Sequence, residues 1–237
     1  MTGCRVGIVC GLGRYPVKSM LGEHPGALEF DHRGVVGDRR YAVRDRTGKF
    51  GSGKTTRRFR YIAGLFEFHA AYDASDRVPV VTFPDGHALR GDDPTIDARL
   101  SASLAVPVSL TRETAVSHFD AGPVHLVTTA SLRVVGDILR SGTDVWRFRP
   151  NIVVDTTGEG FEEDRWVGRE LVLGGGSRLR ITGRTERCGM VGFAQGGLGP
   201  DPRILRSVVE VNAACLGVYA EVLVPGAVRL GDSVRLV

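Results

Sequence analysis

Short apolar stretches, each bounded by glycine, proline or other turn residues, recur along most of this chain of 237 residues. Runs of this kind are typical of β-strands, and the breaks between them leave little room for long helices. Many short strands with few helices predict a mainly β protein, with a β-barrel-like architecture and helices packed at its edges. The patterns predict strands within 6–12, 27–30, 41–43, 65–72, 78–83, 106–110, 125–127, 151–155, 166–173, 177–185, 218–224 and 228–236, and helices at 94–105, 128–139 and 203–211.

The balance of charges argues against nucleic acid as a partner. The chain has 31 lysines and arginines against 27 acidic residues, and its densest basic run, Arg57 to Arg60, is short. Such a run is usually a solvated face and less often an anion-binding one. No apolar run approaches the roughly 20 residues that a bilayer-spanning helix needs, and no signal-peptide pattern is present. We therefore expect a cytoplasmic protein that binds neither nucleic acid nor membranes.

The four cysteines are scattered and form no CxxC pair. Cys4 and Cys10 lie in the first strand pattern, where we expect them to be buried. Cys188 follows a strand pattern, precedes a glycine-rich loop and stands next to Arg187. A neighbouring guanidinium favours the thiolate, which is the form that ligates metals or attacks electrophiles. A small core residue is the alternative interpretation of Cys188.

A basic segment precedes one of the predicted buried strands. Within 147–155, basic and apolar residues alternate before the sequence becomes continuously apolar. If this segment is extended, Arg147, Arg149 and Asn151 share one face, because side chains two residues apart in a strand point the same way. Burying two arginines on one face is costly unless an anionic group lies against them. Arg149 and Asn151 are therefore candidates for binding an anion.

Other polar side chains stand where predicted elements begin or end. Lys18 and Ser19 end a short extended run, and Arg39 lies on a glycine-containing turn before a strand. An arginine on a rigid turn suits phosphate, because its planar fork matches the geometry of the anion. A solvated turn and an ordinary surface arginine are the alternatives. Thr128 or Thr129 can cap the following helix, whose first backbone N–H groups form a natural seat for an anion.

The segment 48–55 matches the phosphate-loop pattern GxxxxGK[ST], and 151–155 offers an acidic partner for it. This pattern indicates a phosphate-binding loop only when a buried parallel strand precedes it and a full helix follows it. Here the preceding segment 41–46 alternates in polarity like a half-exposed antiparallel strand, and 57–60 is only a short helix candidate. We therefore interpret 48–55 as a flexible basic loop.

Six motifs occur together in the order found in the MOSC-domain family, whose name denotes the C-terminal domain of molybdenum cofactor sulfurase. The chain resembles this family over nearly its whole length, and six motifs in order are far more specific than any one of them. The motifs are Tyr15-Pro16-Val17-Lys18-Ser19, Gly37-Asp38-Arg39-Arg40-Tyr41, Thr129-Ala130-Ser131-Leu132, Arg147-Phe148-Arg149-Pro150-Asn151-Ile152-Val153, Arg187-Cys188, and Gly226 with Gly231-Asp232.

The resemblance implies a MOSC-type β-barrel with a few short helices and a smaller β-rich N-terminal subdomain. It divides the chain into 1–112 as the N-terminal region and 113–237 as the MOSC domain, and we expect the two to share one barrel. It also implies a bound molybdenum–pyranopterin cofactor. In the reductase branch, which includes the mitochondrial amidoxime-reducing component, one cysteine ligates the metal, and Cys188 matches it, with Arg187 as its catalytic neighbour. The positions that match the cofactor-binding set are Lys18, Ser19, Arg39, Thr129, Ser131, Arg149 and Asn151, together with Arg187.

The function implied by the resemblance is an oxidoreductase that reduces N-oxygenated small molecules with electrons from a separate electron-transfer protein. A sulfur carrier is the alternative, in which Cys188 bears a persulfide supplied by a cysteine desulfurase. A non-catalytic carrier of the cofactor is a third reading. The sequence departs from the reductase pattern at Glu186, where a small residue is expected and a negative charge stands instead.

Overall fold

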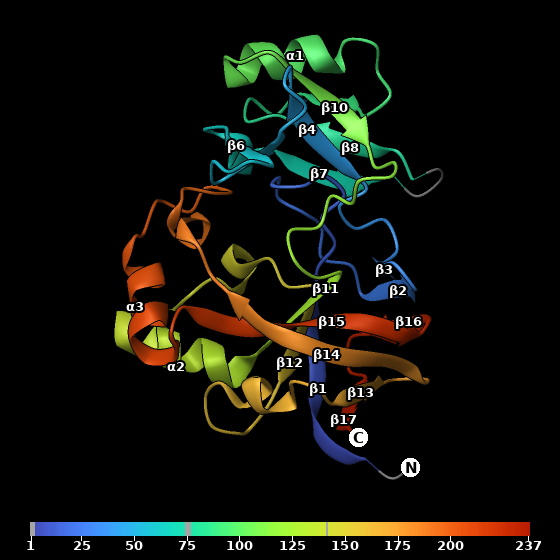
Figure 1. Ribbon diagram of the computed structural model, residues 1–237, viewed down its shortest axis with the longest axis vertical. Coiled ribbons are helices and arrows are strands. Elements are labelled where there is room, and N and C mark those ends of the chain that lie inside the picture. The colour runs from blue at the N-terminus through green and yellow to red at the C-terminus, as the bar shows by residue number, and fades with distance from the viewer. Residues whose placement is uncertain (1–2, 74–76, 141) are drawn as a thin grey trace.

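The computed structural model describes residues 3–73, 77–140 and 142–237. Figure 1 shows two stacked parts, a barrel that contains both ends of the described chain and a smaller β-rich part above it. The chain begins in the barrel, crosses into the upper part and returns to the barrel near residue 124. Within the described ranges the protein is mainly β with three short α-helices, as the strand patterns predict.

The lower part is a closed barrel whose interior is the largest apolar core. Buried side chains such as Leu126, Ile152 and Leu171 belong to this core, whereas their neighbours Val127 and Val153 pack in a second apolar cluster outside the barrel. The described strands of the barrel are, in spatial order, β1 (Cys4–Leu12), β12 (Ile152–Asp155), β11 (Val124–Thr128), β15 (Cys215–Val224), β14 (Ser177–Glu186), β13 (Glu170–Leu173) and β17 (Ser233–Leu236).

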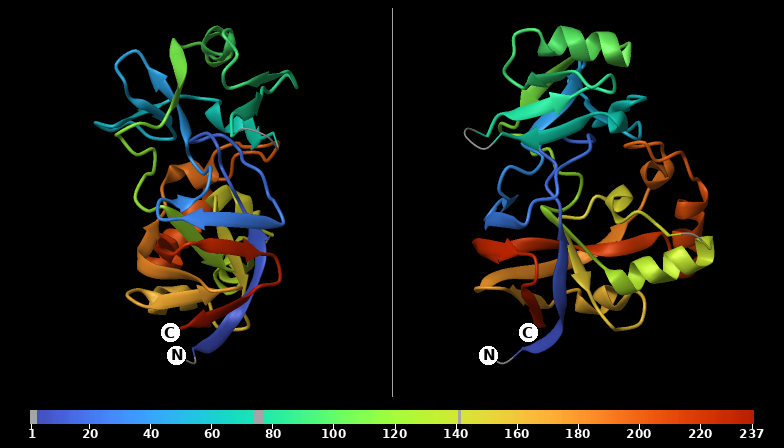
Figure 2. Two further views of the ribbon diagram at one scale, coloured as in Figure 1. Left: turned by 90° about the vertical axis from the view of Figure 1, so that its right-hand side faces the viewer. Right: turned by 180° about the vertical axis from the view of Figure 1, so that it is seen from behind.

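Strands β11 and β12 are parallel, whereas the other neighbours in the barrel pair antiparallel. A parallel pair needs a crossover, and α2 (Thr129–Leu139) provides it. The predicted cap is confirmed, because the Thr128 hydroxyl accepts a hydrogen bond from the Ser131 N–H. Helix α3 (Arg203–Asn212) packs beside α2 on the same side of the barrel (Figure 2).

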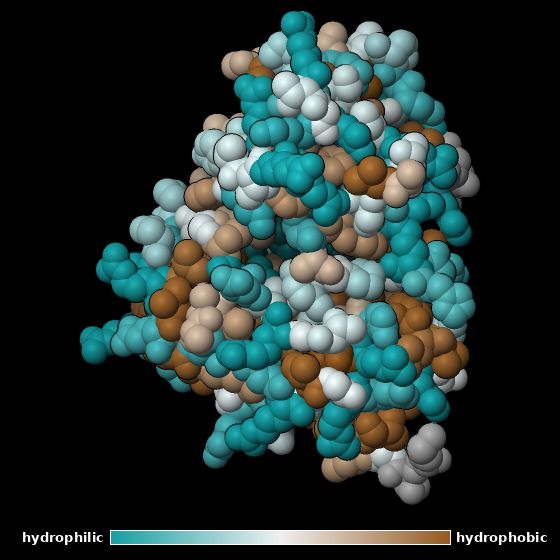
Figure 3. Space-filling view, in the orientation of Figure 1, coloured by the Kyte–Doolittle hydropathy of each residue, from teal (hydrophilic) through white to brown (hydrophobic). Residues whose placement is uncertain are grey.

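The upper part has its own core, around residues such as Val43, Leu65 and Leu100. One sheet has the order β10 (Val108–Arg112), β4 (Tyr41–Asp45), β5 (Phe50–Ser52) and β6 (Phe59–Tyr61), and a second has β7 (His69–Tyr72), β8 (Pro79–Thr82) and β9 (Ala88–Arg90). Helix α1 (Ile96–Leu104) packs on β10. A third sheet, β16 (Gly226–Arg229), β2 (Ala27–Asp31) and β3 (Gly34–Val35), joins the upper part to the barrel core. Hydrophobic patches on the face shown in Figure 3 gather mainly over the barrel.

Three expectations about local structure are wrong. Cys4 and Cys10 are exposed, because Val9 and Leu12 are the buried residues of β1 and both cysteines lie on its solvent-exposed positions. The segment 48–60 also differs from expectation. Phe50–Ser52 is the buried strand β5 rather than part of a flexible loop, and Phe59 and Arg60 of the short helix candidate belong to β6, which pairs with β5. No helix therefore directly follows the segment that matches the phosphate-loop pattern.

The third correction concerns the basic segment before β12. Val145–Phe148 forms a 3₁₀ helix, and Arg149 takes a left-handed backbone conformation with φ of 55°, so the strand begins only at Ile152. Arg147 and Arg149 therefore do not share a strand face. The Arg147 guanidinium donates to the Phe193 and Gly199 carbonyls, away from Arg149.

Replacing Thr128 by valine removes the cap of α2 and one of the two hydroxyl donors to the buried Glu163 carboxylate, the other being Ser131. We expect the free energy of unfolding to fall by about 1–3 kcal/mol. Urea denaturation followed by circular dichroism measures the change. The matched control is Thr182→Val, which removes an exposed hydroxyl bonded to the Tyr219 carbonyl and should cost under about 0.5 kcal/mol. Equal effects of the two substitutions would contradict this account of the α2 cap.

Candidate active site

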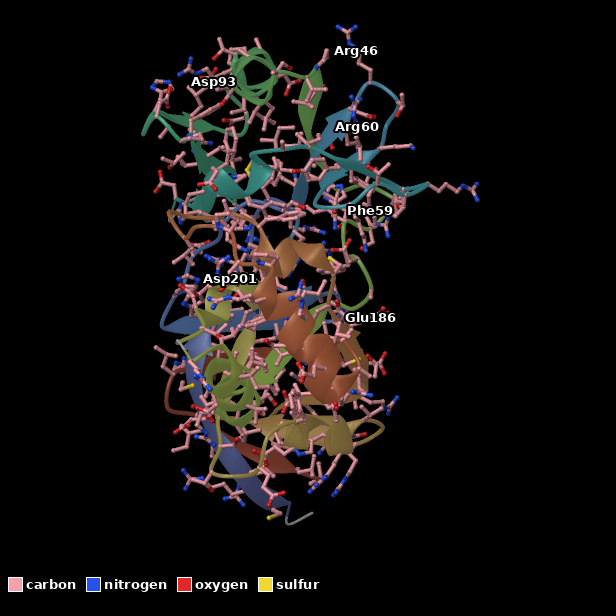
Figure 4. All side chains as sticks on the ribbon, turned by 90° about the vertical axis from the view of Figure 1, so that its left-hand side faces the viewer. Arg46, Phe59, Arg60, Asp93, Glu186 and Asp201 are labelled. Atoms are coloured by element: carbon pink, nitrogen blue, oxygen red, sulfur yellow. The ribbon has the colours of Figure 1, made fainter. Side chains whose placement is uncertain are left out.

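A cavity lies where the barrel meets the upper part, with walls drawn from both. It encloses about 720 Å³ of empty space, part of which is open to solvent. Phe59 of the upper part and Glu186 of the barrel lie one above the other on this side of the molecule (Figure 4). The residues that line the cavity are Lys18, Ser19, Arg39, Ser52, Lys54, Asp120, His125, Phe148, Arg149, Glu186, Arg187, Cys188, Met190 and Tyr219.

Arg149 is a buried cation of this cavity that lacks hydrogen-bond partners for its terminal nitrogens. Its side chain is 5% exposed, and neither of its terminal nitrogens, Nη1 and Nη2, has a hydrogen-bond partner in the described structure. The guanidinium lies over the Tyr15 ring, 4.2 Å from its centroid. Burial, followed by the nearby positive charge of Arg39, lowers the pKa of Arg149 to about 10. Such a group is costly to bury unpaired, so its setting calls for an anion.

Lys18 and Arg39 are paired with carboxylates of the chain itself. The Lys18 ammonium, on a side chain that is 2% exposed, lies 2.7 Å from Asp120 Oδ1 and over the Phe59 ring. Burial lowers the pKa of Lys18 to about 8, although Asp120 acts in the opposite direction. Arg39 forms an ion pair with the fully buried Asp38.

Arg187 is fixed in place next to Cys188. Its Nη2 donates to the Phe148 carbonyl at 2.8 Å, and its Nη1 lies 3.5 Å from His125 Nε2. Burial, and then the charge of Arg187, lower the pKa of His125 to about 3, so the ring is neutral. Its other nitrogen faces the Arg149 carbonyl, which can only accept, so the proton is on Nδ1 and Nε2 is free to accept from Arg187.

Cys188 is half-buried and lines the cavity at the start of the 3₁₀ turn Gly189–Gly192. The end of β14 presents it, with Glu186 and Arg187 immediately before it. The described residues contain no group of three or more His, Cys, Asp or Glu side chains arranged to hold a metal ion.

The backbone carries strain at three of the cavity residues. Ser19, Arg39 and Arg149 have φ values of 65°, 50° and 55°, in the left-handed region that non-glycine residues rarely adopt. Each such residue costs on the order of 1 kcal/mol and persists only where the surrounding structure imposes it. Left-handed residues of this kind cluster at functional sites, and here they turn three predicted site residues to one cavity.

The structure brings together six of the sequence-predicted site residues and leaves three elsewhere. Lys18, Ser19, Arg39, Arg149, Arg187 and Cys188 line the cavity, and Thr129, Ser131 and Asn151 do not.

The three predicted residues outside the cavity lining have structural partners. The Thr129 hydroxyl donates to Asp155, and Ser131 is fully buried and donates to Glu163. The Asn151 side chain accepts from the His125 N–H and donates to the Gly13 carbonyl, so it links β11 to the end of β1. Asn151 therefore acts on the site by holding His125. At the start of α2, where an anion was expected to bind, the Thr128 hydroxyl accepts the hydrogen bond of the Ser131 N–H instead.

Asp120, His125 and Tyr219 were missed by the sequence reasoning. Asp120 stands in a polar loop two residues after His118, a pair whose local sequence suggests only a structural role. His125 and Tyr219 are members of strand patterns, which give no sign that they face a cavity. Their position becomes visible only when the barrel closes.

The donors of this cavity fit an anionic group. Its lining includes five cationic side chains, Lys18, Arg39, Lys54, Arg149 and Arg187, against two acidic ones, Asp120 and Glu186. The unpaired nitrogens of Arg149 are charge-assisted donors of the kind that bind phosphate. A thiol on the same wall suits a soft metal centre. The residues present thus match what a molybdenum–pyranopterin group requires.

Comparison with known families decides the classification. Residues 113–235 match the MOSC domain, and residues 6–121 match the MOSC N-terminal beta barrel domain. The chain belongs to the MOSC domain family. The MOSC domain is linked in general to the molybdenum cofactor. A comparison with curated protein sequences gives no match. No helix in the described ranges of this MOSC protein is both long and apolar enough to cross a bilayer.

Solved structures are similar to this MOSC protein in fold. The YUAD protein from Bacillus subtilis is 14% identical, with 99% of this chain and 98% of that chain covered and a TM-score of 0.54. At this identity the likeness concerns the fold alone. YiiM from Geobacillus stearothermophilus is 16% identical over 49% of this chain and 54% of its own, with a TM-score of 0.39, which is too low to support an argument.

Arg149 and Asn151 should respond in opposite ways to substitution in the protein without a bound ligand. Arg149→Met removes a desolvated, unpaired cation, so the free energy of unfolding should stay the same or rise by about 1 kcal/mol. Asn151→Ala leaves the His125 N–H and the Gly13 carbonyl unsatisfied, and should lower it by about 2–4 kcal/mol. Urea denaturation of both variants beside the wild type measures this. A large loss of stability in Arg149→Met would show that Arg149 supports the fold rather than a ligand.

Proposed function

We propose that this protein binds a molybdenum–pyranopterin cofactor in the cavity and reduces N-oxygenated small molecules. The observation that carries the proposal is the buried Arg149 guanidinium with two unpaired terminal nitrogens in a cavity that also holds Cys188. A cation in this setting gains a partner when an anionic group binds, which converts an unfavourable burial into charge-assisted hydrogen bonds.

In this proposal Lys18, Arg39 and Arg149 hold the anionic part of the cofactor. Arg149 contributes two free donors, and Lys18 and Arg39 reach the same cavity from the upper part. Bidentate arginines fix orientation as well as charge, because two parallel N–H groups meet two oxygens. The left-handed backbone at Arg39 and Arg149 directs both side chains before any ligand arrives, so less ordering is needed on binding.

Cys188 is the proposed metal ligand, and Arg187 is its fixed neighbour. The bound group would supply a centre that exchanges two electrons, while the chain supplies the thiolate and its surroundings. The Phe148 carbonyl and His125 anchor the Arg187 guanidinium, so a positive charge stays beside the thiol.

Two neutral polar groups face the space in front of Cys188. His125 is uncharged, and burial raises the pKa of Tyr219 so that its hydroxyl keeps its proton. Glu186 and Lys54 are exposed at the same cavity, where solvent can supply protons. Reduction of an N–OH group to N–H takes two electrons and two protons and releases water. The electrons would come from a separate electron-transfer protein, and we place the reaction in the cytoplasm. In this proposal the two domains, 1–112 and 113–237, both contribute residues to the site.

Molybdenum content tests this function directly. The full chain, produced in a host that makes the cofactor, should contain near-stoichiometric molybdenum by metal analysis. With reduced viologen as electron donor, it should convert benzamidoxime to benzamidine. We expect Cys188→Ser to lose at least about a hundredfold in turnover and Arg149→Met to retain under about a tenth of the metal. The matched control is Cys215→Ser, a half-buried cysteine outside the cavity lining, which should resemble the wild type.

Two results would overturn the reductase proposal. The first is protein that reduces the substrate but contains no molybdenum, and the second is equal behaviour of Cys188→Ser and Cys215→Ser. Mass spectrometry after incubation with a cysteine desulfurase and cysteine examines the alternative of a sulfur carrier. One added sulfur on Cys188, removable by a reducing thiol, in protein without molybdenum would favour that function instead.

A further inference from the structure

Lys18, one of the cations in the cavity, is paired with the solvent-exposed carboxylate of Asp120. Asp120 Oδ1 lies 2.7 Å from the Lys18 ammonium, and both residues line the cavity. Lys18 is 2% exposed, whereas the Asp120 side chain is 46% exposed. The pair therefore joins a fully buried cation to an anion that reaches it from the solvent side.

The segment that carries Asp120 is held in place by contacts of the two residues before it. It belongs to the connection between β10 and β11, where the chain passes from the upper part to the barrel. The buried His118 ring donates from Nδ1 to the Arg39 carbonyl, and the backbone N–H of His118 donates to the Glu113 carboxylate. The Arg33 guanidinium lies over the Phe119 ring, 4.2 Å from its centroid. These contacts involve the residues just before Asp120, and none of them uses the Asp120 side chain.

The carboxylate of Asp120 has Lys18 as its only hydrogen-bond partner among the described residues. A change of its side-chain rotamer toward solvent is therefore enough to release the ammonium. Asp38, the partner of Arg39, is different. It is 0% exposed and accepts a further hydrogen bond from the Tyr15 N–H, so it cannot leave Arg39 without disturbing the fold. Of the two carboxylates paired with cavity cations, only Asp120 is placed to give way.

Lys18 depends on this carboxylate for its charge. Burial opposes the ammonium, and so do the positive charges around it, while Asp120 supports it. A buried lysine without a counter-ion loses its proton readily. The charged or titratable groups that face Lys18 are Asp120 and His118 from the connection, Arg39 from the turn before β4, and Lys54 and Arg58 from the segment between β5 and β6.

We propose that Asp120 is a positioning residue, the resident counter-ion of Lys18, which keeps the ammonium charged and directed into the cavity until the anionic group of a ligand takes its place. The inference rests on the proposed function, because it assigns a task to a residue of the same cavity. Every ligand that uses Lys18 must displace Asp120. Anions that make few contacts are thereby kept out, and a ligand that also reaches the unpaired Arg149 is admitted.

Sulfate is a suitable probe, because it keeps two negative charges across the pH range in which Lys18 titrates. Isothermal titration calorimetry at pH 6 compares the full chain with Asp120→Asn, both produced in a host that cannot make the cofactor. Without the competing carboxylate, Asp120→Asn should bind sulfate at least about tenfold more tightly. Asp120→Glu, which keeps the charge, should bind as the wild type does. Circular dichroism confirms that each variant is folded.

The matched control for charge is Glu186→Gln. It removes the same unit of negative charge from the same cavity but from a residue without a bond to Lys18. Its sulfate affinity at pH 6 should change by less than about threefold. An increase equal to that of Asp120→Asn would show a general effect of charge and would overturn the proposal. So would an Asp120→Asn variant that binds sulfate no more tightly than the wild type.

The pH dependence of sulfate affinity is a second measurement, and it would not change if Asp120 had only a structural role. In the wild type, sulfate affinity should persist from pH 6 and fall as pH rises through about 8, where Lys18 loses its proton. In Asp120→Asn the fall should occur at least about one pH unit lower, because the carboxylate that supports the ammonium is gone. Identical midpoints in the two proteins would contradict the proposal. Sulfate binding requires neither molybdenum nor turnover, so this result is separate from the test of the reductase function.

Discussion

The arrangement of this protein depends on cationic side chains that are buried in the wall of a cavity, such as Lys18 and Arg149. Arg149 is the extreme case, because its terminal nitrogens have no partner in the described structure. An unpaired buried cation works against folding, so the apolar cores of the barrel and of the upper part must outweigh it. The barrel is closed, so its strands have no free edge at which the backbone near Arg149 could rearrange easily. In the proposed function, an anion bound by Arg149 would offset this cost with charge-assisted hydrogen bonds.

Neither part of the molecule forms the site alone. Lys18, Arg39 and Asp120 come from connections in or next to the upper part, whereas Arg149 and Cys188 come from the ends of barrel elements. Rigid strands fix where these connections begin and end, and left-handed residues turn their side chains inward. This division explains how a few cationic side chains and a thiol can be placed within one cavity although they lie up to 170 positions apart, from Lys18 to Cys188.

Local patterns were good guides wherever packing follows from periodicity. Most of the strand patterns, the three helices and the Thr128 cap depend on neighbouring residues only, and the structure has them. The strand expected at 65–72 instead begins as a 3₁₀ helix at Leu65–Glu67, and the one expected at 228–236 is divided between β16 and β17. Cys10 shows the limit, because an apolar run does not tell which residues of a strand face the core. Arg149 is more instructive. The sequence marks it as a buried cation, but it reaches the cavity from a left-handed residue after a 3₁₀ turn and not from a strand face.

By itself, the sequence determined a mainly β chain of the MOSC family and named most of the cations and the thiol of the site, because propensity, turn residues and short motifs are local properties. Only the tertiary structure decided which polar residues meet. It put Thr129, Ser131 and Asn151 to structural use and brought Asp120, His125 and Tyr219 into the cavity. The reason is physical: pairing between distant segments is set by barrel closure, and no local pattern encodes which side chain will find itself beside which charge.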